Sequence, residues 1–108
     1  MVKAIFNIIL AVHGLIHLMG FLKAFGIAEL KELTLVVTKS AGILWLLASL
    51  LFIAVLTQYL AGYMFWRVIA IPAILVSQTL IIMYWRDAKF GTIPNLIILI
   101  VMTISFVQ

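Results

Sequence analysis

Two histidines four residues apart, His13 and His17, are the residues of this 108-residue chain best suited to bind a ligand or to transfer protons. An interval of four places both rings on one face of a helix. Such a pair can bind a Zn, Cu or Ni ion, hydrogen-bond a ligand, or exchange protons near neutral pH. It can equally join neighbouring helices, each hydrogen bond stabilising a membrane protein by roughly 0.6–2 kcal/mol. The residue types and their spacing leave these uses open.

The two histidines lie in a chain that is 68% hydrophobic and only 9% charged. A soluble domain is nearer half apolar and a quarter charged. A chain this short cannot hide so much apolar surface in a water-facing fold. The sequence therefore predicts an integral membrane protein with the lipid bilayer as its surroundings. Open sheet edges are excluded from hydrocarbon, so the predicted fold class is all-α.

Four apolar segments predict a bundle of four transmembrane helices that forms one domain over residues 1–108. The segments cover residues 4–27, 41–62, 65–85 and 93–107. The first three are close to the ~20 residues that a spanning helix needs. The fourth is shorter, so we expect it either to lie where the bilayer is thinned or to start earlier, near Phe90.

The connection after the first span, residues 28–40, is not simply polar. Leu30, Leu33 and Val37 fall on one helical face. The charged residues around that face are Glu29, Lys31 and Glu32. An apolar stripe among charges is typical of a helix that lies in the membrane interface. We therefore expect a short interfacial helix between the first two spans.

The basic residues are single and scattered, which disfavours nucleic acid as a partner. An even number of spans puts both termini on one side of the membrane, where Lys3 and Arg67 also fall. The other five basic residues fall on the opposite side: Lys23, Lys31, Lys39, Arg86 and Lys89. The positive-inside rule then predicts that the first and third connections are cytoplasmic and the termini outside.

Other polar residues inside the spans reach the depth of the histidine pair. Polar groups in lipid cost free energy unless they find partners, so we expect these side chains to meet. Aromatic residues are expected to wall the resulting pocket on the cytoplasmic side. The predicted ligand-binding residues are His13, His17, Ser49, Gln78, Asn95, Trp45 and Tyr84. With no carboxylate at that depth, the two rings are expected to be mostly uncharged.

No cofactor is required by the sequence, although a divalent metal or haem would suit histidine. His13 and His17 supply only two metal ligands, and the carboxylates Glu29, Glu32 and Asp87 lie at the interface. Haem bound from both sides would need one histidine from each of two protomers. Small residues four apart, such as Gly20 and Ala24, predict close helix contacts, either within the protomer or in a homo-oligomer.

Three functional hypotheses follow from these residues. The first is a small-ligand-binding or proton-linked transport module, for which a quinone is one ligand, built around the histidine pair. The second is an accessory or structural subunit of a membrane complex, and the third is a haem- or metal-binding redox protein. The chain has no cysteine, no Ser-His-Asp set and no nucleotide-binding loop. The sequence therefore favours a non-enzymatic role.

The stretch from His13 to Gly20, HGLIHLMG, resembles the first-helix pattern of the DoxX-like family of small four-span bacterial membrane proteins. His17 stands where that pattern has a basic residue, and the arginine usual near the start of the helix is missing. The turn from Asp87 to Thr92, DAKFGT, is similar to one found in uncharacterised bacterial membrane proteins of this size. The resemblance implies a bacterial inner membrane and no defined activity.

Overall fold

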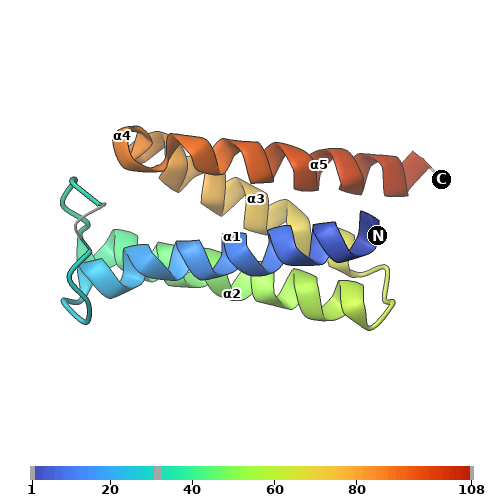
Figure 1. Cartoon of the computed structure of the whole chain (residues 1–108), viewed down its shortest axis with the longest axis horizontal. Coiled ribbons are helices and arrows are strands. Elements are labelled where there is room, and N and C mark those ends of the chain that lie inside the picture. The colour runs from blue at the N-terminus through green and yellow to red at the C-terminus, as the bar shows by residue number, and fades with distance from the viewer. Residues whose placement is uncertain (1, 31–32, 108) are drawn as a thin grey trace.

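The computed structural model describes residues 2–30 and 33–107, and it is all-α, as predicted (Figure 1). Within these residues, four helical segments are long and apolar enough to cross a membrane. The elements in chain order are α1 (Val2–Ala24), α2 (Lys39–Leu60), α3 (Trp66–Met83), α4 (Trp85–Ala88), the short 3-10 helix η1 (Lys89–Gly91) and α5 (Thr92–Val107). The prediction of a four-helix membrane bundle is confirmed.

The helices form two layers, α1 with α2 and α3 with α5 (Figure 1). Both described ends of the chain lie at one end of the bundle, together with the α2–α3 connection. The α1–α2 connection and α4 lie at the opposite end. The most extensive packing is between α1 and α2, and α1 touches α5 over a much shorter stretch. The α1–α5 seam is therefore the loosest contact between neighbouring long helices.

The predicted spans match the helices to within a few residues, except at the start of the fourth. There α4, η1 and α5 form one helical run, Trp85–Val107, which is long enough to cross a membrane. The earlier start follows from a polar stretch, residues 86–89, that continues the helical path instead of forming an open loop. The fourth span thus begins even before Phe90.

The predicted interfacial helix between the first two spans is wrong for the described residues. Residues 28–30 and 33–38 contain no helix, while Lys31 and Glu32 lie outside the described residues. From residue 33 to 37, half-buried side chains alternate with exposed ones. This period of two is typical of extended chain, not of a helix. We call residues 33–38 the strap.

The strap is extended because charged side chains replace the backbone hydrogen bonds of a helix. The Lys23 ammonium group donates to the carbonyl oxygens of Leu33 and Leu35. The Leu35 N–H and the Thr34 hydroxyl donate to the two carboxylate oxygens of Asp87, at 2.8 and 2.6 Å. Two side chains from α1 and α4 therefore hold the strap across the end of the bundle.

Aromatic rings fill the end of the bundle that holds the chain termini. The Phe6 ring lies edge-on to Tyr59 and Trp66, with centroids 4.9 and 5.8 Å apart. The buried residues of this cluster are Phe6, Leu10, Phe52, Val55, Trp66, Ala70, Ala73, Ile98 and Met102. We call this cluster the packed half, and the opposite end the cavity half.

The small residues Gly20 and Ala24 bring α1 and α2 together within the protomer. A Cβ atom added at Gly20 would lie 2.3 Å from Cγ of Trp45. One added at Gly42 would lie 2.3 Å from Cβ of Ala24. No side chain could be added at either position without moving its neighbour, so this small-residue face is already occupied by α2.

Candidate functional site

The proton positions on His17 follow from a single backbone carbonyl group. Its Nδ1 atom lies 2.7 Å from the carbonyl oxygen of His13, one turn earlier in α1. A carbonyl oxygen can only accept, so Nδ1 must carry the proton. In an uncharged ring the other nitrogen, Nε2, then accepts. It lies 2.6 Å from Oγ of Ser77 on α3, so the Ser77 hydroxyl donates to it.

The same reasoning fixes the orientation of the Asn95 amide group and the position of the proton on the His13 ring. Since the Ser77 hydroxyl proton points to His17, Oγ of Ser77 accepts from Nδ2 of Asn95 at 2.9 Å. Nδ2 also donates to Oε1 of Gln78 at 3.0 Å. The Oδ1 atom of Asn95 therefore faces Nε2 of His13, at 2.7 Å, and accepts from it. His13 thus carries its proton on Nε2, and its Nδ1 has a free lone pair.

This network joins α1, α3 and α5 in the membrane interior. His13, His17, Ser77 and Asn95 are all buried. A further bond, from Nε2 of Gln78 to Oγ1 of Thr92 at 3.1 Å, extends it along the α3–α5 contact.

Three of the four histidine ring nitrogens are engaged by protein groups. Binding one metal ion through both rings would break part of the network, and the described residues contain no cluster of three His, Cys, Asp or Glu suited to a metal.

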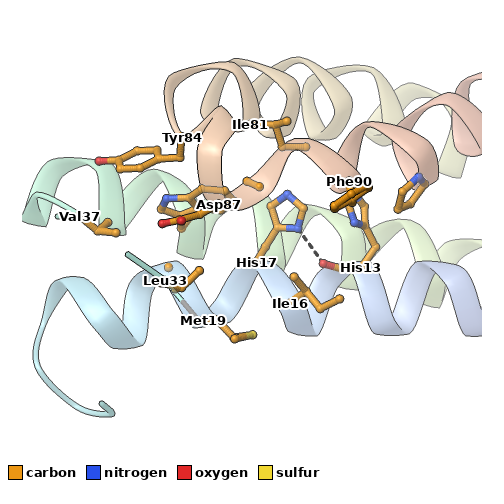
Figure 2. Close-up of a pocket in the computed structure, with 15 residues that line it drawn as sticks. His13, Ile16, His17, Met19, Leu33, Val37, Ile81, Tyr84, Asp87 and Phe90 are labelled. Carbon is orange, nitrogen blue, oxygen red and sulfur yellow. Dashed lines mark hydrogen bonds between the residues drawn. The ribbon is translucent and has the colours of Figure 1, made fainter. Parts of the chain in front are cut away.

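A cavity of about 340 Å³ lies beside the network, at the cavity half (Figure 2). Its wall is mostly apolar and comes from α1, α2, α3, α4, η1, α5 and the strap. His13 and His17 project from α1 toward Ile81 of α3 and Phe90 of η1. Leu33 and Val37 of the strap close the end of the cavity near Asp87. The site is thus an apolar chamber with a few polar groups in its wall.

A separate groove of about 260 Å³ between α1 and α5 adjoins the cavity. The groove and the cavity share three wall residues: His13, Ile16 and Pro94. Ile16 stands at the junction and is 52% exposed. The other groove residues are Ile8, Ile9, Val12, Ile93 and Ile97. The groove on the loose α1–α5 seam therefore lies directly beside the cavity.

The predicted site residues differ in where the structure places them. Trp45 and Tyr84 both line the cavity, with ring centroids 6.0 Å apart, at the end that the strap covers. Gln78 reaches His13 only through Asn95, and neither amide side chain lines the cavity. Ser49 is buried in the α1–α2 contact, where it makes no hydrogen bond to either histidine.

Two components of the site were missing from the sequence prediction. Ser77, the partner of His17, is four residues from Ala73, and small residues at this spacing predict only close helix packing. Its position next to Gln78 on a membrane helix was a signal that could have identified it. The strap residues Leu33 and Val37 gave no such signal, because their role depends on an extended conformation.

Comparison of the chain with protein-family models, with curated proteins and with solved structures found no match. The DoxX-like resemblance of the stretch from His13 to Gly20 therefore stays a prediction.

Proposed function

We propose that this protein binds a small, uncharged, lipid-soluble ligand in the cavity beside His13. The observation that carries the proposal is the cavity itself, an apolar chamber that adjoins the α1–α5 groove and shares three wall residues with it. Ligand pockets in proteins are mostly apolar, contain a few placed polar groups and have volumes of roughly 300–1,000 Å³. The cavity fits this pattern in size and in composition.

The charges around the cavity support an uncharged ligand. Asp87 lines the cavity, but its two carboxylate oxygens already accept hydrogen bonds from Thr34 and Leu35. None of the described residues that line the cavity is a lysine or an arginine. A charged group placed there without a partner would cost several kcal/mol. The ligand would reach the site from the lipid, through the groove, because the strap covers the end nearest the aqueous phase.

Proton-linked transport is a further form of this proposal. The Oγ atom of Ser77 lies 2.6 Å from Nε2 of His17 and 3.4 Å from Oδ1 of Asn95. If Nε2 of His17 took up a proton, it would donate to Oγ of Ser77. The Ser77 hydroxyl would then turn to donate to Oδ1 of Asn95, and the heavy atoms would stay in place. A change in proton occupancy would then need only the rotation of one hydroxyl group.

An accessory or structural subunit is the second candidate, and the network favours it. The hydrogen bonds of His13, His17, Ser77, Asn95 and Gln78 satisfy one another across three helices. A network of this kind stabilises the bundle whether or not a ligand binds. The two candidates differ in one measurable property, which is saturable binding in the cavity.

Trp45 provides a direct test of ligand binding, because it lines the cavity and is only 7% exposed. Replacing the other two tryptophans, Trp66→Phe and Trp85→Phe, leaves it as the only indole. Bromododecane, whose bromine quenches tryptophan fluorescence on contact, is then titrated into the protein in vesicles. We expect quenching that saturates. Quenching that rises only linearly with the probe would contradict ligand binding and leave the structural role.

A matched pair of variants tests the route through the groove. Ile16→Phe places an aromatic ring at the junction of cavity and groove, so quenching of Trp45 by bromododecane should develop several-fold more slowly. Leu15 is the control: it is 58% exposed on the same helix and lines neither space. Leu15→Phe should leave the rate of quenching unchanged. Equal effects of the two substitutions would show that the ligand does not pass Ile16.

We further propose a bacterial inner membrane location with both termini outside, from the DoxX-like resemblance and the excess of basic residues at the opposite end. Since the chain has no cysteine, single cysteines report the orientation cleanly. Tyr63→Cys, in the α2–α3 connection, should react with an impermeant maleimide added outside, and Val36→Cys in the strap should not. The reverse pattern would invert the orientation without affecting the ligand proposal.

A further inference from the structure

One ring nitrogen of the histidine pair, Nδ1 of His13, has no protein partner. The network places the proton of His13 on Nε2, where it is donated to Asn95, so Nδ1 is an acceptor with a free lone pair. Nδ1 makes no hydrogen bond to any described residue. It is also not fully covered, because the covered and unpartnered side-chain atoms in the described residues are Asn7 Oδ1 and Trp45 Nε1.

The surroundings of His13 show which space this nitrogen can face. Only 2% of the residue is exposed, and it lines both the cavity and the groove. Its remaining accessible surface therefore borders the two spaces that a ligand would occupy. An acceptor in an apolar wall without a partner costs free energy, and a donor from the ligand would remove that cost.

From this geometry we infer that the ligand is a lipophilic alcohol or phenol whose hydroxyl group donates a hydrogen bond to Nδ1 of His13. The inference rests on the proposed function and specifies its ligand class. The hydroxyl lies where the cavity and the groove meet, and the apolar body of the ligand extends along the groove beside Ile16 and Pro94. His13 is then a positioned acceptor, held by Asn95 on its far side.

Trp45 has the other unpartnered polar atom near the cavity, and it is not the contact proposed. Its Nε1 is fully covered by protein atoms, so a ligand in the cavity does not reach it without movement of the wall. An indole N–H would also select a ligand with an acceptor, whereas the His13 lone pair selects a ligand with a donor. The two groups thus predict different ligand preferences.

The test compares dodecanol with dodecyl methyl ether, which has a similar chain but no donor. The first measurement is displacement of bromododecane from the variant in which Trp45 is the only tryptophan. Dodecanol should displace it at about three- to tenfold lower concentration than the ether, which corresponds to one net hydrogen bond. The second is nitrogen NMR of the protein with labelled imidazole rings. Dodecanol should move the Nδ1 signal of His13 upfield, and the ether should not.

His17 serves as an internal control, because Ser77 already occupies its accepting nitrogen and its signals should stay in place. The spectrum of the His13→Gln variant assigns the signals, and the displacement measurement does not depend on that variant. Equal displacement by alcohol and ether, or an unmoved His13 signal, would overturn the inference while leaving the cavity as a binding site. If bromododecane itself shows no saturable quenching, the proposed function fails as well.

Discussion

The two ends of the bundle are made by the same helices and differ in how they are filled. In the packed half, the rings of Phe6, Tyr59 and Trp66 interlock edge-on. In the cavity half, the corresponding space between α1 and α5 is left open beside Gly91 and Pro94. One end therefore resembles the interior of a stable protein, and the other resembles a binding site.

The difference shows how a chain of this length can combine stability with a cavity. The packed half fixes the positions of α1, α2, α3 and α5 through close contact of large side chains. In the cavity half, α2 packs on α1 where Trp45 meets Gly20, and directional hydrogen bonds of His13 and His17 join α1 to α3 and α5. Hydrogen bonds can hold helices at a fixed distance without filling the space between them, so an open volume can persist there.

Removing a large side chain from each half should have the largest effect in the packed half. Leu10 is fully buried there, so Leu10→Ala should destabilise the bundle by about 4 kcal/mol through a new void. Ile81→Ala removes a side chain that already borders the cavity, so fewer contacts are lost and we expect about 2 kcal/mol. Reversible unfolding in mixed detergent micelles measures both. Equal losses would show that the cavity half is packed as tightly as the other.

Two asparagines sharpen the comparison of hydrogen bonding in the halves. Asn95 bonds to His13, Ser77 and Gln78, so Asn95→Leu should cost about 2 kcal/mol, at roughly 0.6 kcal/mol or more for each bond. Asn7 has a buried Oδ1 with no partner among the described residues, so Asn7→Leu should be neutral or stabilising. The same unfolding measurement applies. A larger loss at Asn7 than at Asn95 would contradict the network as the organiser of the cavity half.

The sequence predicted the helices well because apolar length alone determines them in a membrane. It also brought His13, Asn95, Trp45 and Tyr84 to one region, since depth along a span can be counted. Depth alone does not determine toward which neighbouring helix a side chain points. Ser49 on α2 and Ser77 on α3 are both buried serines, and only Ser77 reaches a histidine.

The strap could not be predicted, because its conformation depends on two distant side chains. The apolar residues at positions 30, 33 and 37 fit a helical face, and that pattern predicts a helix. Lys23 and Asp87 instead bind backbone groups of the extended chain. Contacts between residues this far apart in sequence leave no local pattern. The same holds for the cavity, which is a property of how the helices meet.

The smallest expected effect concerns the strap, which Asp87 helps to hold across the end of the cavity half. Asp87→Asn keeps the size of the side chain and removes the charge that attracts the Leu35 N–H and the Thr34 hydroxyl. Hydrogen bonds to a charged acceptor are stronger than those to a neutral one by about 1 kcal/mol, so hydrogen exchange of the Leu35 amide should become about five- to tenfold faster.

Lys89→Gln is the matched control for that exchange experiment. The Lys89 ammonium lies over the Phe90 ring, 5.4 Å from its centroid, and makes no bond to the described residues of the strap. Its removal should leave exchange at Leu35 unchanged. Unfolding stability should change by less than about 1 kcal/mol in either variant, because both side chains lie at the bundle surface.

Unchanged exchange in Asp87→Asn would mean that Lys23 alone holds the strap. Faster exchange without faster bromododecane binding would agree with a ligand that arrives through the groove, because opening the strap would then expose an end of the cavity that the ligand does not use.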